Sequence, residues 1–380
     1  MKQLRDDFMR LASTGIPASE EMAHRLSVAL EDFIGFWTKE TLLFVAEGGS
    51  ELRFLEAPYG RGKTHLLLLM ARAAREAGFA TALVECSPES KPFASIELTY
   101  RSVIPALRFP STDCSKGVDL FDFLKSCSLN QINGLQESDR INPGFRNVLS
   151  AYAKWSRADA PLKSVLEGVS NLIRSQPENP VRIPALYKQD HRLPRPLGKL
   201  TKRTAMPWLR GLLQMPQALG LKGLVVLFDE TGADFHLGRE NLSVKRAHFA
   251  HLRNLVDHLG VGRLPGCAIT YAVATDLIQQ ARETLLPLAQ RIERVLPEDP
   301  NPRAVWCFLD ELTVPQTKNP VFFLKLGQRL AEIGQACGFE EHRITNALVL
   351  LPSEANRRAA SINNAVIRDF IKLIASTITG

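Results

Sequence analysis

One stretch, from Leu52 to Thr64, constrains the fold of this 380-residue chain more than any other. It fits the phosphate-binding loop pattern, in which a small residue, here Ala57, is followed by four variable positions and then by Gly, Lys and Ser or Thr. Alternating apolar residues precede the loop as a strand, and the apolar run from His65 to Met70 follows it as a helix. Glycines let backbone N–H groups turn around an anion, and the helix points its positive N-terminus at the same phosphates. The stretch therefore predicts a nucleotide-binding strand, loop and helix, with a plain glycine turn as the alternative.

The side chains of this loop predict its ligand. Lys63 is expected to reach the β- and γ-phosphates of ATP, and Thr64 is expected to offer its hydroxyl to Mg²⁺. ATP and Mg²⁺ are therefore the predicted cofactors. The residues expected to surround the phosphates are Ala57, Pro58, Tyr59, Gly60, Arg61, Gly62, Lys63, Thr64 and His65.

A second apolar strand, residues 224–228, ends in two acids, Asp229 and Glu230. In ATPases with such a loop, an Asp at this place holds Mg²⁺, and the adjacent Glu orients and deprotonates the attacking water. A further buried strand over residues 266–275 is expected to lie between the two motif strands. Its last residue, Thr275, would then sense the γ-phosphate, and a cap for the helix that follows is the alternative role.

The composition is that of a globular protein, with 45% hydrophobic and 23% charged residues. No apolar run is long enough for a bilayer, and residues 1–10 lack the apolar core of a signal peptide, which predicts a cytoplasmic protein without a membrane partner. The six cysteines lack paired spacing, which favours buried thiols. His248 and His251 share one helix face, but no Cys or acid in register completes a metal site. The net charge of +7 is a modest excess for this length and points toward an acidic partner, nucleic acid or a membrane surface.

Both ends of the chain have helical periodicity. Residues 1–50 predict an N-terminal helical segment, in which the apolar residues from Met22 to Phe33 form one amphipathic helix that packs on the core. Helical periods over residues 319–337 and 359–376 predict a small C-terminal helical lid over residues 311–380.

The centre of the chain, residues 51–310, alternates buried strands with helices. Five strands are predicted, the last over residues 305–309, and this alternation indicates an α/β fold with a parallel sheet. One of the helices is expected to run from Ile96 to Leu107. The alternation is interrupted over roughly residues 110–205, where amphipathic pieces without strands predict a helical insertion.

The end of this insertion, residues 182–203, carries the strongest local charge bias in the chain. The stretch contains seven basic residues and a single acid, Asp190, and the prolines among them keep the backbone extended. An extended basic stretch can follow a phosphate backbone, which predicts nucleic acid as a partner. A solvated loop is the alternative explanation. The basic residues are Arg182, Lys188, Arg192, Arg195, Lys199, Lys202 and Arg203.

The predicted order of elements resembles the AAA+ type of P-loop NTPase, which has a five-stranded parallel sheet between helices. The phosphate loop follows the first predicted strand, the two acids end the third strand, and helices follow the last strand. The stretches 47–65, 87–88, 224–230, 252–256 and 264–266 look more narrowly like the BrxD-type ATP-binding proteins of BREX phage-defence systems. The resemblance covers most of the chain outside roughly residues 110–180. It implies other defence proteins as partners. The ATP and Mg²⁺ residues that it implies are Lys63, Thr64, Asp229 and Glu230, with Thr275 as sensor.

The resemblance also implies roles for arginines. An arginine from a neighbouring subunit would complete hydrolysis, and Arg291 and Arg294 are the candidates, which implies a homo-oligomer with shared sites. The final helix departs from the relatives because no arginine stands near Ala365. The residues that could contact ATP from the lid instead are Arg357, Arg358 and Arg368.

These features predict an ATP hydrolase that couples nucleotide state to the handling of DNA or partner proteins in a BREX-like defence system. A nucleotide-gated interaction module with negligible turnover is a second hypothesis, and Glu230 argues against it because this residue serves hydrolysis. A third hypothesis is an initiator- or loader-like ATPase that acts on replication DNA. A C-terminal winged helix would favour it, but too few residues follow the predicted lid to form one.

Overall fold

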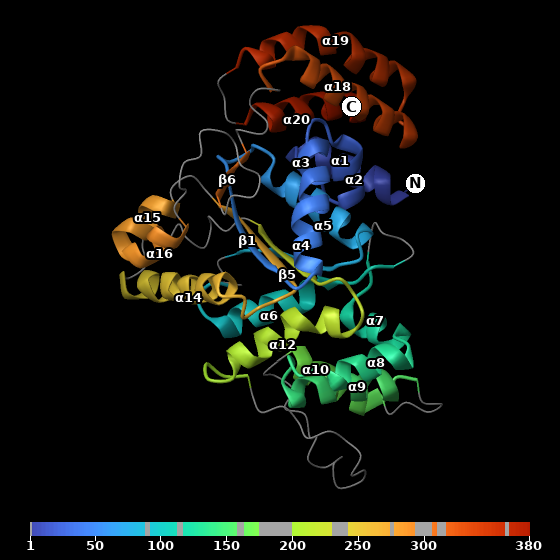
Figure 1. Ribbon diagram of the computed structural model, residues 1–380. Coiled ribbons are helices and arrows are strands. Elements are labelled where there is room, and N and C mark those ends of the chain that lie inside the picture. The colour runs from blue at the N-terminus through green and yellow to red at the C-terminus, as the bar shows by residue number, and fades with distance from the viewer. Residues whose placement is uncertain are drawn as a thin grey trace.

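In the computed structural model the residues described are 2–87, 92–111, 117–157, 163–174, 200–229, 242–273, 277–292, 306–309, 317–361 and 365–380. They form an α/β fold in which helices cover both faces of one six-stranded sheet (Figure 1). The strand order is β3-β2-β4-β5-β1-β6, and all neighbours are parallel except β2 and β3. The strands are β1 (Ser50–Glu56), β2 (Ala80–Glu85), β3 (Leu107–Arg108), β4 (Leu224–Asp229), β5 (Cys267–Val273) and β6 (Trp306–Phe308).

The sheet therefore differs from the five-stranded parallel sheet that the sequence predicts. The additional strand is β3, in which Leu107 and Arg108 pair antiparallel with Ala82 and Thr81 of β2. The predicted helix included Leu107, whereas helix α6 (Ile96–Ala106) ends one residue earlier. Pro105 lies in the last turn of α6 and has no backbone N–H to donate, which weakens the helix there. The chain leaves the helix and adds a short strand to the sheet edge.

The two central strands, β4 and β5, are largely apolar because each is covered on both faces. Every residue of β4 and β5 is buried. Side chains of a strand alternate between its faces, so each strand contributes to two separate cores. One core contains Leu55, Val225, Leu227, Ala268 and Ala272. The other contains Phe54, Val226, Phe228, Ile269 and Tyr271.

Two groups of helices cover these faces. On the first core lie α2 (Glu20–Leu26), α3 (Glu31–Phe36), a π-helical turn (Trp37–Thr41), α4 (Leu42–Ala46) and α5 (Lys63–Glu76). On the second lie α6, α12 (Ala205–Ala218) and α14 (Leu242–Gly260), with α15 (Leu277–Thr284) and α16 (Leu286–Ile292) beside α14. Figure 1 shows α14, α15 and α16 together at one side of the sheet.

The helices that the sequence analysis assigns to an insertion extend the second core. Those that the structure describes are α7 (Leu120–Ser126), α8 (Leu129–Glu137), α9 (Pro143–Trp155) and α10 (Lys163–Arg174). They lie beyond α6 and α12 as seen from the sheet (Figure 1). The buried Tyr100 of α6 donates a hydrogen bond to the carbonyl of Ile173 at 2.6 Å. The insertion is thus packed onto the sheet's own helices, as its apolar faces require.

The two ends of the chain form one helical bundle, which we call the terminal helical unit. It consists of α1 (Lys2–Thr14), α18 (Pro320–Ala336), α19 (Glu341–Ala359) and α20 (Val366–Thr379). The sequence pattern missed α19 and started the last helix at Ala359, seven positions before Val366. The reason is that α19 buries few residues and contains Pro352, so its apolar period is weak. Its buried residues are Ala347, Leu351 and Ala355.

The predicted amphipathic helix from Met22 to Phe33 is two helices in the structure. The chain breaks between α2 and α3, where Ala29 adopts a left-handed backbone with φ 74°. Met22 packs in the terminal helical unit, whereas Leu30 and Phe33 pack on the sheet. The N-terminal segment thus connects the two parts of the molecule. Within the described ranges, no helix combines the length and apolarity that a bilayer crossing needs.

Candidate functional site

The loop between β1 and α5 turns on two glycines. Gly60 and Gly62 have φ values of 81° and 93°, a left-handed conformation that side chains other than Gly rarely adopt. A Cβ added to Gly62 would meet no atom within 4 Å, so the need for glycine there is conformational. Helix α5 begins at Lys63, directly after this turn. A turn with left-handed glycines that leads directly into a helix N-terminus is a backbone geometry that suits an anion.

Lys63 lies across this loop. Its ammonium Nζ donates hydrogen bonds to the carbonyl oxygens of Ala57 at 2.5 Å and Pro58 at 3.1 Å. Thr64 is in the first turn of α5 and is partly buried. These contacts keep the positive charge of Lys63 beside the loop's backbone. A phosphate group held by the loop would therefore lie within reach of the lysine.

His65 connects the start of α5 to the N-terminal helices. Its Nε2 lies 2.8 Å from the carbonyl oxygen of Ala23 in α2, so this nitrogen carries the hydrogen. Burial lowers the pKa of His65, which keeps the ring neutral at pH 7. This contact attaches the first turn of α5 to α2, and no local sequence pattern predicts it.

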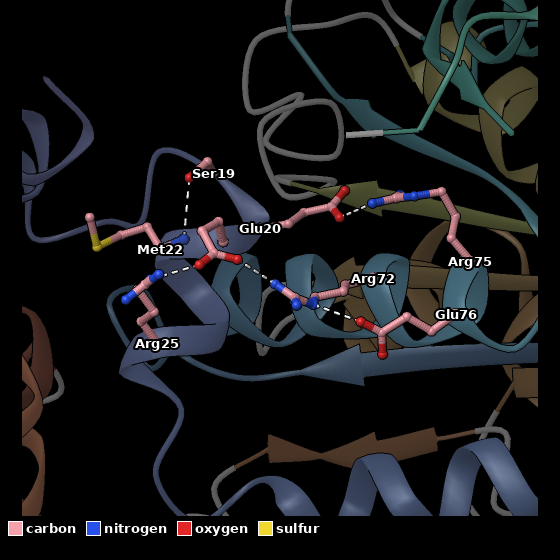
Figure 2. Close-up of polar contacts among 8 residues, drawn as sticks. Ser19, Glu20, Met22, Arg25, Arg72, Arg75 and Glu76 are labelled. Carbon is pink, nitrogen blue, oxygen red and sulfur yellow. Dashed lines mark hydrogen bonds and ion pairs between the residues drawn. The ribbon is translucent and has the colours of Figure 1, made fainter. Parts of the chain in front are cut away.

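Charged pairs continue this attachment along α5 (Figure 2). Arg75, whose side chain is 1% exposed, pairs with Glu20 and donates to the hydroxyl of Thr81 at 3.0 Å. Arg72 donates to Glu21 at 2.7 Å and to Glu76 at 2.8 Å. Ser19 caps α2 by accepting from the N–H of Met22. We call the contacts of Glu20 and Glu21 with Arg75 and Arg72 the α2–α5 brace.

The second motif lies at the same edge of the sheet as the loop. Asp229 is the buried last residue of β4, and its carbonyl accepts from the N–H of Cys86 at 3.0 Å. Strand β5 lies between β4 and β1, as the sequence predicted. All three strands are parallel, so their carboxyl ends meet at one edge, and two strand spacings, about 10 Å, separate β4 from β1. Glu230 and Thr275 lie outside the described residues.

The arginines that the sequence analysis singled out have different partners in the structure. Arg291, at the end of α16, pairs with Asp257 of α14 and donates to the carbonyl of Pro287 at 2.6 Å. Arg294 lies outside the described residues. Arg357 and Arg358 pair with Glu354 of their own helix, at 3.0 and 3.3 Å. Arg368 is different, because it reaches the phosphate loop and donates a hydrogen bond to the hydroxyl of Tyr59.

Residues 182–199 of the basic stretch lie outside the described residues, whereas Lys202 and Arg203 are described and are exposed. Over the ranges that the structure describes, no three His, Cys, Asp or Glu side chains are grouped as a metal site. Thr64 and Asp229 supply oxygen atoms at the loop's edge of the sheet, which is the ligand chemistry that Mg²⁺ prefers.

Comparison with known families identifies the chain's relatives. The profile described as BREX system ATP-binding protein BrxC/D matches residues 17–121 and 192–378. The chain belongs to this family. The BrxC/D match leaves out residues 122–191, which contain α8, α9 and α10, and this gap falls within residues 110–205, where the insertion is predicted. Searches of curated proteins and of solved structures found no significant match. As a BrxC/D family member, the chain is an ATP-binding protein of a BREX phage-defence system.

Proposed function

We propose that this protein binds and hydrolyses ATP as an AAA+ type ATPase, and that it couples nucleotide state to DNA or partner-protein handling within a BREX system. The observation that carries the proposal is the placement of two motifs at one sheet edge. The loop with left-handed Gly60 and Gly62 follows β1, and Asp229 ends β4, with β5 between them. An anion cradle and a buried carboxylate at this separation suit a nucleotide with its metal ion.

The residues divide the chemistry between them. Lys63 would stabilise the charge on the β- and γ-phosphates, and Glu230 would orient the attacking water and accept its proton. Thr64 and Asp229 would hold Mg²⁺, which neutralises charge on the phosphate oxygens when bound. Thr275 would sense the γ-phosphate. In this proposal residues 51–310 form the ATPase core and residues 311–380 the lid.

Two interactions complete the proposal. An arginine from a neighbouring subunit, Arg291 or Arg294, would stabilise the transferring phosphoryl group in a homo-oligomer. The basic stretch 182–203 would bind a nucleic-acid backbone. Membership of the BrxC/D family supports other defence proteins as partners.

The test compares nucleotide binding and turnover in three proteins. The parent should bind ATP with Mg²⁺ and hydrolyse it. Lys63→Ala should lose binding or hydrolysis, because the charge at the β- and γ-phosphates is removed. Glu230→Gln should retain ATP and stop turnover, because an amide keeps the shape of the side chain but cannot accept a proton.

Each outcome decides a different part of the proposal. Equal ATPase rates in Lys63→Ala and the parent would contradict the site assignment. Loss of ATP affinity in Glu230→Gln as large as in Lys63→Ala would make Glu230 a structural residue or a metal ligand. A parent that binds ATP without measurable turnover would identify a nucleotide-gated module instead of a hydrolase.

A further inference from the structure

Three distant parts of the chain meet at the side chain of Arg368, the third residue of α20. Its Nη1 donates to the hydroxyl of Tyr59, and its guanidinium carbon lies 5.0 Å from the centre of the Tyr59 ring. Its Nε donates to the carbonyl oxygen of Thr14, at the end of α1, at 2.7 Å. Arg368 thus connects the phosphate loop to α1 and α20, the two helices of the terminal helical unit that come from opposite ends of the chain.

The approach of α1 to α20 at this point requires a glycine. Gly15 has φ +68°, and a Cβ there would lie 2.7 Å from Cγ and from the carbonyl oxygen of Arg368 and 2.8 Å from Cγ of Lys372. Buried Phe8 and Leu11 of α1 pack in the same core as Phe370 of α20. The Thr14 carbonyl is therefore held in place by the packing of two helices, and it fixes the direction of the Arg368 guanidinium.

The guanidinium of Arg368 contacts the otherwise exposed side chain of Tyr59. The residue is 67% exposed, so packing against the protein restrains its ring little. It stands directly before Gly60, whose left-handed φ of 81° begins the turn of the loop. Glycine has the widest range of backbone conformations, so an unrestrained loop of this sequence would lose more entropy when it closes on a phosphate.

We propose that Arg368 is a positioning residue for the phosphate loop and acts through Tyr59. The cation over the ring and the hydrogen bond to the hydroxyl hold the first half of the loop in the conformation that binds phosphate, so nucleotide binding costs less ordering. The inference rests on the proposed nucleotide site. It also links that site to the terminal helical unit, because a contact that favours nucleotide binding is itself favoured by nucleotide.

The experiment measures ADP affinity by calorimetry and ATPase kinetics in Arg368→Ala, Tyr59→Leu and the double variant. Each single variant should raise the ADP Kd and the KM for ATP about tenfold, roughly the effect of one hydrogen bond to a charged group. The kcat should stay within about twofold, because the contact orders the loop and does not touch the reacting atoms. The double variant should be no worse than either single variant, since both remove the same contact. Tyr59→Phe, which keeps the ring, should lie between parent and Tyr59→Leu.

Lys372→Ala is the matched control, because Lys372 carries the same charge one turn later on α20, and its ADP Kd should equal the parent's. A second readout is hydrogen exchange at the end of α1 and the start of α20. ADP should slow this exchange in the parent and leave it unchanged in Tyr59→Leu.

Three results would overturn the inference. Equal ADP affinity in Arg368→Ala and a nucleotide-binding parent would reject it and leave the proposed function standing. Additive losses in the double variant, with kcat reduced in Arg368→Ala alone, would show that Arg368 contacts the nucleotide directly and does not act through Tyr59. A parent that binds neither ADP nor ATP would reject the proposed function and this inference together.

Discussion

The ring of Phe228 stacks on the ring of Tyr271, with centroids 5.0 Å apart and planes 9° apart. The stack continues from Tyr271 to Phe54 at 5.2 Å and from Phe54 to Trp306 at 4.9 Å. These four residues come from β4, β5, β1 and β6, which are neighbours in that order. The aromatic ladder crosses the sheet one residue before Asp229. These stacked rings favour one register of β4, which carries this carboxylate, relative to β1, which carries the loop, because a shift along the strands would separate the rings.

The hydroxyl of Tyr271 is buried and finds no hydrogen-bond partner among the described residues. Tyr271→Phe should therefore stabilise the protein by about 1 kcal/mol, since it removes an unsatisfied polar group and keeps the stacked ring. Tyr100→Phe is the control, because the hydroxyl of Tyr100 donates to Ile173 at 2.6 Å. It should destabilise by about 1 kcal/mol. Urea unfolding measures both changes, and destabilisation by Tyr271→Phe would reveal a partner for its hydroxyl.

Stability at alkaline pH should depend on buried thiols. Burial raises the pKa of Cys267 to about 12, from a usual value of 9.0. The folded state then keeps a proton that the unfolded state releases, so this contribution is complete below pH 9 and is lost as the pH rises from 9 toward 12. The loss amounts to about 1.4 kcal/mol per pH unit. In Cys267→Ala, the unfolding free energy should therefore fall less steeply with pH over this range, by about 1.4 kcal/mol per pH unit.

The same measurement on Cys127 offers a comparison. Burial raises the pKa of Cys127 to about 11, so Cys127→Ala should flatten the decline only between pH 9 and 11. A Cys267→Ala variant with the parent's alkaline slope would mean that this thiol ionises in the folded protein as it does in the unfolded chain.

Within the α2–α5 brace, the pair of Arg75 with Glu20 should contribute most to stability, because the side chain of Arg75 is buried. Arg75→Ala leaves Glu20 partly buried without its partner, and it should lower the unfolding free energy by about 3 kcal/mol. Arg25→Ala breaks a pair with Glu21 whose side chains are 43% and 36% exposed, and it should cost less than about 1 kcal/mol. A double-mutant cycle between Glu20→Gln and Arg75→Ala checks the assignment. A coupling energy near zero would show that Arg75 stabilises by its packing alone.

Hydrolysis should rise with protein concentration if an arginine acts between subunits. Such an arginine typically contributes roughly 10³ to 10⁵ in rate, so Arg291→Ala or Arg294→Ala should abolish the rise while ATP affinity stays parental. Arg253→Ala serves as a control, because Arg253 lies 3.5 Å from the same Asp257 that pairs with Arg291. Assays over a range of subunit concentrations test this, and a constant specific activity in the parent would argue against shared sites.

The basic stretch should determine how DNA binding depends on salt. Each phosphate contact contributes about 0.9 to the log–log salt slope on duplex DNA. Replacing Arg192, Arg195, Lys199 and Lys202 with Ala should weaken binding and flatten the slope by roughly three to four units, with DNA-free ATPase unchanged. A control variant with the same charge change carries Ala at the exposed positions Lys39, Lys125, Arg140 and Lys154. An unchanged slope in the first variant would assign the stretch to a solvated loop or a protein contact.

Much of the fold follows from local sequence signals. The strand before the loop and the apolar strand that ends at Asp229 could be predicted, because buried parallel strands are continuous apolar runs and glycines mark turns. The position of β5 between these two strands was also predicted, whereas the order of the other strands was not. Three features were predicted wrongly because the local sequence pattern is weak or misleading there. The two-residue strand β3 has no period of its own, α19 carries Pro352 in its interior, and the break at Ala29 lies within one continuous helical pattern.

By itself the sequence determined which residues could bind a nucleotide, since loop chemistry depends on residues that are adjacent in the chain. Only the tertiary structure decided what surrounds them. The pairing of α1 with α20, the contact of Arg368 with Tyr59 and the brace between Glu20 and Arg75 join segments that are distant in sequence. Such contacts have no periodic signature. They depend on how helices pack once apolar faces are buried, and on which charged side chains that packing brings within hydrogen-bonding distance.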